Sequence, residues 1–192
     1  MTAAEGRLLA AAEGKGMIGE ARGERFEVVS ANSSLTFFAT SPTQSAYGKT
    51  TELSGFIDAS WNADGTLGQE PRPKMHVEFK VETLRTGNDL QDREMWKLID
   101  SKRFPKIAGD LREFQRGSVR GRYTAAGLIT LAGLARTYES EFRLERNGKN
   151  VTVDGQINVD VRDFGLKPMK LLVLSVAPLV RVRLRLVAVR SA

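Results

Sequence analysis

Few residues of this chain have the types and spacing that catalysis requires. The sequence has 192 residues, no cysteine and one histidine, His76. A thiolate zinc site, a cysteine nucleophile and a multi-histidine metal centre are therefore excluded. His76 is the single candidate base for a serine hydrolase triad, and no G-x-S-x-G nucleophile elbow accompanies it. We assign no catalytic residue and no metal ligand, and we interpret the chain as a protein that is not an enzyme.

Two glycine-containing segments resemble nucleotide-binding motifs but lack the context that such motifs need. Gly14 to Gly19 spells G-x-G-x-x-G, but a poor strand former precedes it and a weak helix follows it. Gly48-Lys49-Thr50 matches the end of a phosphate-binding loop, whose leading glycine would have to stand at Thr43. We therefore predict no nucleotide cofactor.

The net charge of +6 comes entirely from the C-terminal end of the chain. No Asp or Glu follows Asp163, whereas six cations do: Lys167, Lys170, Arg181, Arg183, Arg185 and Arg190. One interpretation is an edge strand that its arginines keep in solution. The other is a head-group or anion patch formed by Arg181, Arg183 and Arg185, which would contact phosphate or an anionic membrane surface. Nucleic acid is not expected as a partner, because this segment offers only Phe164 for base stacking.

Apolar and polar residues alternate along most of the chain after Arg25, which is typical of strands with one wet face. The clearest run is Met75, Val77, Phe79 and Val81. Similar runs are Leu35–Phe37–Ala39, Ile57–Ala59–Trp61, Phe142–Leu144, Val151–Val153, Ile157–Val159–Val161 and Val180–Val182–Leu184–Leu186. Asn147-Gly148 between two of them predicts a hairpin with a type I′ turn, in which both residues have positive φ.

One segment breaks this pattern. Leu90, Met95, Leu98 and Ile99 have nearly helical spacing, Asn88 or Asp89 can cap the N-terminus, and Pro105 follows. Regular strands with one helical interruption predict an antiparallel sandwich or a closed barrel. Asp92, Arg93 and Glu94 on this helix are interpreted as solvated or capping charges, with a head-group contact as the alternative.

Four motifs in the same order resemble those of the YceI-like family. They are Ser33 to Phe37, the central signature from Thr83 to Ile107, Gly127 to Gly133, and Asp163-Phe164-Gly165-Leu166. The similarity extends from about Arg25 to Val189. Two positions depart from it, because Gln91-Asp92 stands where the family usually has Arg-Asp, and Glu94 or Met95 stands where it commonly has histidine.

The resemblance implies an all-β fold, a lipocalin-like antiparallel barrel of about eight strands with one short helical insertion. It also implies an apolar lipid ligand, polyisoprenoid-like, inside the barrel, and no general catalytic residues. We expect a flexible tail over residues 1–22 and the barrel domain over 23–192. We predict that the inward apolar side chains bind the ligand: Leu35, Phe37, Ile57, Trp61, Val77, Phe79, Val81, Phe142 and Val159. Periodicity alone is equally compatible with a packed core.

Three functions remain open at this point. The first is non-enzymatic carriage or sequestration of a long apolar lipid, with no cofactor other than that lipid. The second is an enzyme acting on an apolar substrate, and the third is a scaffold that docks to a membrane or a protein through its basic C-terminal segment. A homodimer is a further alternative. The chain as written is expected in the cytoplasm, because Leu8 to Ala12 is too short for a signal core, although many family members are exported.

Overall fold

The computed structural model describes residues 23–40, 45–167, 170–171, 174–175 and 177–191. The predicted tail over residues 1–22 lies outside them. The strands are β1 (Glu24–Val28), β2 (Ser34–Thr40), β3 (Ser45–Thr50), β4 (Ser54–Ala59), β5 (Lys74–Lys80), β6 (Lys106–Arg116), β7 (Arg122–Leu131), β8 (Leu134–Asn147), β9 (Asn150–Asp160), β10 (Lys170–Leu171), β11 (Leu174–Ser175) and β12 (Leu179–Arg190). The helices are α1 (Asp89–Ile99) and the short 3₁₀ turns η1 (Ser30–Asn32), η2 (Val81–Thr83) and η3 (Val161–Phe164).

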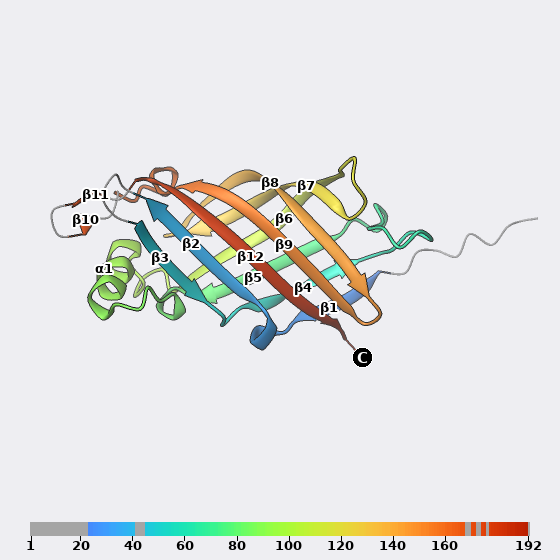
Figure 1. Cartoon of the computed structure of the whole chain (residues 1–192), viewed down its shortest axis with the longest axis horizontal. Helices are drawn as coiled ribbons and strands as arrows, with labels where there is room; N and C mark the ends of the chain where they lie inside the picture. Colours follow the sequence, from blue (N-terminus) through green and yellow to red (C-terminus); the bar gives the residue numbers. More distant parts are fainter. Residues whose placement is uncertain (1–22, 41–44, 168–169, 172–173, 176, 192) are drawn as a thin grey trace, which may run out of the picture.

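Eight antiparallel strands form a closed barrel, which confirms the predicted fold. Their order is β1-β4-β5-β6-β7-β8-β9-β12, and β12 pairs with β1 to close the ring. The edge of β12 that pairs with β1 near residue 190 pairs with β2 over residues 180–185, and β3 pairs with β2. Figure 1 shows an elongated barrel with α1 and the β10–β11 hairpin at one end and the end of β12 at the other.

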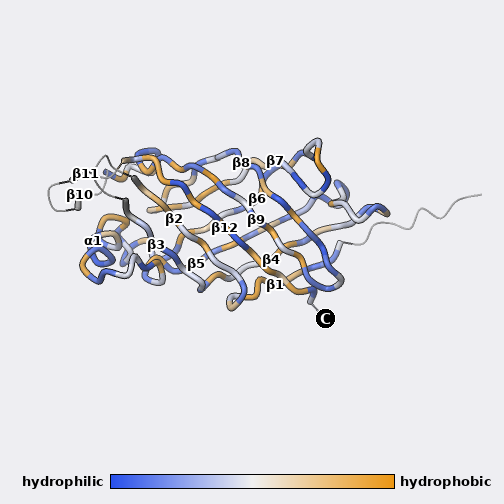
Figure 2. Tube along the Cα trace, viewed as in Figure 1, coloured by the Kyte–Doolittle hydropathy of each residue, from blue (hydrophilic) through white to orange (hydrophobic). Residues whose placement is uncertain are grey.

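The alternation of side chains follows from the pleat of these strands. On β12, for example, the side chains of Leu186 and Ala188 are fully buried, whereas the side chain of Arg185 is exposed. Figure 2 shows the same alternation of hydrophilic and hydrophobic residues along the long strands. The apolar residues therefore gather inside the barrel, and the charged ones cover it.

The predicted helix forms α1 at one end of the barrel. Its N-cap is Asn88, whose side-chain oxygen accepts hydrogen bonds from the backbone N–H groups of Leu90 and Gln91 at 3.0 and 3.1 Å. Asp100 ends the helix in the left-handed region with φ of 57°. Met95 and Ile99 are buried, so the apolar face of α1 packs onto the interior of the barrel.

The predicted hairpin between β8 and β9 is present, but its turn differs from the prediction. Asn147 pairs with Asn150, so Gly148 and Lys149 are the two loop residues. Gly148 has φ of 59°, whereas Asn147 is not among the residues with positive φ. Only the first of the two loop residues has positive φ, as in a type II′ turn, whereas the predicted type I′ turn would have positive φ at both. The β7–β8 hairpin instead has positive φ at both loop residues, Ala132 and Gly133.

Candidate ligand-binding site

An apolar cavity of about 250 Å³ lies inside the barrel at the end that α1 covers. Every residue that lines it is aliphatic, aromatic, methionine or glycine. Met95, Leu98 and Ile99 contribute from α1, while Val180, Val182 and Leu184 contribute from β12. We call this part of the interior the cavity half. Such a lining excludes water and offers no hydrogen bond to a polar ligand, so it favours hydrocarbon.

Five of the nine predicted binding residues line this cavity. They are Leu35, Phe37, Val77, Phe79 and Val159. They come from β2, β5 and β9, so strands that are distant in the sequence enclose one space. Their contact with a ligand stays a prediction.

The structure places the other four predicted binding residues outside the cavity lining. Ile57 and Val81 are buried in the core, at 3% and 0% exposure. β4 ends at Ala59 and β5 at Lys80, so Trp61 and Val81 lie beyond the strands that were expected to carry them. Phe142 faces inward on β8 but stacks on Tyr123, with 5.3 Å between the ring centroids. Four of the nine predicted residues thus lie outside the cavity lining, and their contact with a ligand stays a prediction.

Ile57, Trp61 and Phe142 belong to, or lie next to, a solid part of the interior at the opposite end of the barrel, whereas Val81 begins η2, which packs on α1. We call this solid part the packed half. Its fully or almost fully buried residues are Phe26, Ile57, Tyr123, Leu144, Val151, Val153, Leu186 and Ala188. Trp61 packs edge-on against Phe26 at 6.1 Å, and the Arg146 guanidinium lies 4.9 Å from the Trp61 ring centroid. Arg146 also pairs with Glu24 at 2.9 Å, which keeps its charge compensated.

The sequence prediction missed several lining residues. The apolar spacing of Met95, Leu98 and Ile99 was itself the signal for three of them, since the apolar face of a helix must pack against something. Ala39 and Gly109 also line the cavity. Their small size leaves space that a larger side chain would fill, a signal that could have been recognised in the inward register.

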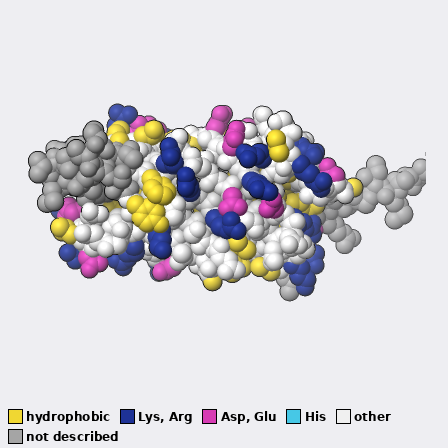
Figure 3. Space-filling view, in the orientation of Figure 1, with side chains coloured by type: hydrophobic (Ala, Val, Ile, Leu, Met, Phe, Trp, Pro, Cys, Tyr) yellow, Lys and Arg dark blue, Asp and Glu magenta, His cyan; other side chains and the backbone are white. Residues whose placement is uncertain are grey.

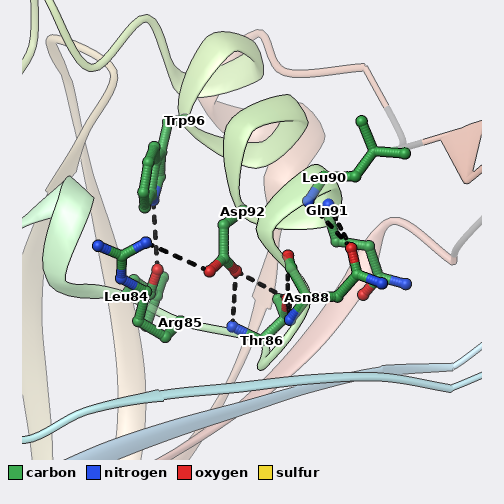
Figure 4. Close-up of polar contacts among 8 residues, drawn as sticks. All are labelled: Leu84, Arg85, Thr86, Asn88, Leu90, Gln91, Asp92 and Trp96. Atoms are coloured by element: carbon green, nitrogen blue, oxygen red, sulfur yellow. Dashed lines mark hydrogen bonds and ion pairs between the residues drawn. The ribbon is translucent and has the colours of Figure 1, made fainter.

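A buried carboxylate fixes α1 in its place over the cavity (Figure 4). Asp92 is 2% exposed and accepts hydrogen bonds from the backbone N–H and the hydroxyl of Thr86, both at 2.7 Å. The Arg85 guanidinium lies 3.5 Å from the same carboxylate and 4.5 Å from the Trp96 ring centroid. Trp96 Nε1 in turn donates to the backbone oxygen of Leu84 at 3.2 Å. Asp92 is thus neither a solvated charge nor free to bind a head group, and it ties the helix to the preceding loop.

A side chain with a strongly raised pKa lies next to η3, whose Val161 lines the cavity. Tyr138 on β8 stacks on Phe164, and its hydroxyl donates to Asp163 at 2.6 Å. Burial and the negative charge of Asp163 both favour the neutral phenol, and they raise the pKa of Tyr138 to about 12. This contact joins β8 to η3, where the β8–β9 pairing has ended.

The three predicted patch arginines all point outward along β12, but they differ in their surroundings. All three are exposed. Arg185 pairs with Asp154 at 3.1 Å, whereas Arg183 donates to the neutral Gln156 at 3.2 Å. Within the described residues, Arg181 and Arg183 have no carboxylate within ion-pair distance. Binding of an anion here stays a prediction.

His76 lies on the outer face of the barrel, next to two carboxylates. Its Nδ1 is 2.8 Å from Asp110, and its Nε2 is 3.7 Å from Glu78. Lys106 contacts the same Glu78 at 2.6 Å and, as the leading cause, lowers the pKa of that carboxyl. On the neighbouring strands Arg25 binds Asp58 at 2.7 Å. These contacts are cross-strand pairs of a charged barrel surface.

Comparison with known families agrees with this geometry. Residues 26–188 match the family model described as YceI-like domain. No curated protein matches the sequence.

Several solved structures share the fold. BcnA from Burkholderia cenocepacia has a TM-score of 0.70 and 17% identity, and the match covers 83% of this chain and 98% of that one. A polyisoprenoid binding domain from Saccharophagus degradans has a TM-score of 0.65 and 11% identity, with 86% and 98% covered. The Campylobacter jejuni YceI protein has a TM-score of 0.60 and 13% identity, with 80% and 89% covered. At these identities the likeness establishes the fold alone.

In the described ranges, no group of three or more His, Cys, Asp or Glu side chains is arranged to hold a metal ion. Among the helices of those ranges, none combines the length and the hydropathy needed to cross a membrane.

Proposed function

The chain belongs to the YceI-like domain family, and we propose that it binds and carries a polyisoprenoid-like lipid chain without chemical change. The observation that supports this most is the apolar cavity enclosed by strands and α1. One of the structural neighbours is a polyisoprenoid binding domain, which is consistent with the same ligand class.

The size of the cavity bears on how such a ligand would fit. About 250 Å³ exceeds the roughly 150 Å³ engineered cavity that holds benzene, but it lies just below the roughly 300–1,000 Å³ of typical ligand pockets. The cavity as it stands therefore has room for a segment of a long chain. The remainder would leave past α1, or the cavity would widen as the chain enters.

The binding free energy would come from burial of hydrocarbon, at about 0.8 kcal/mol for each methylene removed from water. Affinity should therefore rise with chain length until the cavity is full and then level off. Head-group chemistry should matter less than length, because the lining carries no polar side chain.

A length series of isoprenoid alcohols tests this proposal. Delipidated protein would be titrated with geraniol, farnesol, geranylgeraniol and undecaprenol, with displacement of a fluorescent fatty-acid probe as the readout. We expect saturable binding that strengthens from geraniol to the longer chains. A palmitate titration serves as the comparison for branched against straight chains. Absence of saturable binding for every alcohol would contradict the proposal.

A further inference from the structure

The outer face of the wall behind the cavity carries aromatic rings next to cations. Alternation on β2 sends Phe37 into the cavity and Phe38 outward, and on β12 it sends Val182 inward and Arg181 outward. Figure 3 shows a group of hydrophobic side chains flanked by Lys and Arg over the region of β2, β3 and β12. We define the cation–aromatic patch by five residues: Phe38, Tyr47, Lys49, Arg181 and Arg183.

Strand register brings these residues together. Phe38 stands opposite Tyr47 on one side and opposite Arg181 on the other. The rings of Phe38 and Tyr47 are 5.1 Å apart, and the Arg183 guanidinium lies 5.5 Å from the Phe38 centroid. In the next row, Lys49 and Arg183 flank the small side chain of Thr36. Two rings and three cations thus share one continuous surface.

The charge of this patch is uncompensated within the described part of the chain. The strand neighbours on the far side of Arg181 and Arg183 are the neutral Asn158 and Gln156. Lys49, Arg181 and Arg183 have no ion pair there. Arg185, two residues further along β12, differs because it is bound to Asp154. The cationic surface therefore ends before Arg185.

We infer that the cation–aromatic patch docks on an anionic lipid surface. Lysine and arginine are attracted to anionic head groups, and tyrosine side chains favour the membrane–water interface. Tyr47 is 43% exposed, so its ring is available to such an interface. A nucleic acid fits less well, because Tyr47 is the one large aromatic ring of the patch that is well exposed for base stacking.

The position of the patch suggests that docking would serve lipid transfer between the bilayer and the cavity. This part of the inference rests on the proposed function. Phe37, Ala39, Val180 and Val182 line the cavity from the same strand segments whose outward side chains form the patch. A membrane bound at the patch would therefore lie beside the end of the barrel that contains the cavity. A lipid chain would have only a short way to move between the bilayer and the interior.

Vesicle co-sedimentation tests the inference. Wild-type protein would be mixed with vesicles of phosphatidylcholine alone or with added phosphatidylglycerol, at low and high salt. We expect binding to the anionic vesicles that falls as salt rises. The double variant R181Q/R183Q should bind about 30-fold more weakly, since each cation near an anionic surface contributes about 1 kcal/mol.

A matched control separates the patch from net charge. Arg112 and Arg122 are exposed and, among the described residues, have no ion pair, so R112Q/R122Q removes the same charge elsewhere. This control should retain most of the binding. A Tyr47→Trp variant should keep binding, and its fluorescence should shift to shorter wavelength with anionic vesicles.

Each outcome decides the inference. Salt-sensitive anionic binding that R181Q/R183Q loses and R112Q/R122Q keeps would support it. Equal loss in both double variants, no vesicle binding, or retention on duplex DNA instead of vesicles would overturn it. Circular dichroism would confirm that the variants are folded. Isoprenoid binding is measured separately, so vesicle binding by a protein that takes up no isoprenoid would refute the proposed function and leave the patch established.

Discussion

The two halves of the barrel interior share β7, β9 and β12 but are filled differently. In the packed half, the Phe26 ring packs against Trp61, the Tyr123 ring stacks on Phe142, and the Arg146 guanidinium lies over Trp61. In the cavity half, Ala39 and Gly109 stand where rings would be needed to fill the space. The same alternation thus produces a solid core at one end and a cavity at the other. The size of the inward residues, and not their polarity, makes the difference.

Matched truncations should give the largest effect and the clearest contrast. Phe26→Ala removes a fully buried ring and should lower the free energy of unfolding by about 3–5 kcal/mol. Phe79→Ala should cost less, at or below the low end of that range, because the Phe79 ring already borders a void. Urea unfolding of the two variants checks this. A larger loss for Phe79→Ala would contradict the distinction between the halves.

Replacing a small inward residue by a larger one should affect stability in the packed half and ligand binding in the cavity half. Ala188→Leu overfills the packed half and should cost about 1–3 kcal/mol, while leaving isoprenoid binding intact. Ala39→Leu enters the cavity, so it should cost little stability and weaken binding. Thermal melts and the geranylgeraniol titration measure both quantities. If Ala39→Leu destabilised the protein as much as Ala188→Leu, the cavity half would be tightly packed in solution.

A variant that weakens the attachment of α1 should change the dynamics of the cavity half and leave the packed half unchanged. Asp92→Ala leaves the Thr86 backbone N–H without its partner, at a cost of about 1–3 kcal/mol. Hydrogen exchange should then accelerate over α1 and the loop before it, with Val151 and Leu186 in the packed half still protected. Ligand dissociation should become faster. Acceleration spread evenly over the barrel would show that α1 is not a separate cover.

The smallest expected effect is on how the stability of the folded protein depends on pH. Tyr138 near the cavity half and Asp64 at the other end of the barrel should contribute in different pH ranges. The pKa of Tyr138 is raised to about 12 in the folded protein, mainly by burial, from an ordinary value of 10.0. Its contribution to stability is complete below pH 10 and is lost as pH rises towards 12. Asp64, between β4 and β5, has its pKa lowered to about 2, mainly by hydrogen bonds from Thr66, so its contribution is lost as pH falls from about 4 towards 2.

Two conservative variants test these assignments by stability measured across pH. Tyr138→Phe should flatten the alkaline decline and leave the acid side unchanged. Asp64→Asn should flatten part of the acid decline and leave the alkaline side unchanged. An unaltered alkaline profile in Tyr138→Phe would show that the Tyr138–Asp163 contact does not stabilise the cavity half.

Alternation along the chain predicted an antiparallel sandwich or barrel, because it records which side of a strand is wet, and the resemblance to the YceI-like family selected the barrel. It does not record where a strand ends, so Trp61 and Val81 were assigned to strands that stop before them. Asn147-Gly148 predicted a hairpin but not the pairing of Asn147 with Asn150 that sets the turn. These errors are local, and they do not change the topology.

The site was harder to predict than the fold for a physical reason. An inward residue borders either a void or a neighbour, and this depends on residues from other strands at the same level. Phe79 and Phe142 have the same pattern in the sequence, yet one lines the cavity and the other stacks on Tyr123. Likewise, alternation predicted that Arg181 points outward, but only the register of β2 and β3 shows that Phe38 and Tyr47 lie beside it.

Native mass spectrometry of the protein as purified tests the central claim most directly. A double variant, A39L/G109V, fills the cavity from two walls, and an added Cβ at Gly109 meets Val77 in ordinary contact at 3.5 Å. We expect wild type and Ala188→Leu to carry an apolar molecule that organic solvent extracts, and A39L/G109V to be empty. A wild-type protein without bound lipid, or a ligand that A39L/G109V retains and Ala188→Leu loses, would contradict the assignment of ligand binding to the cavity half.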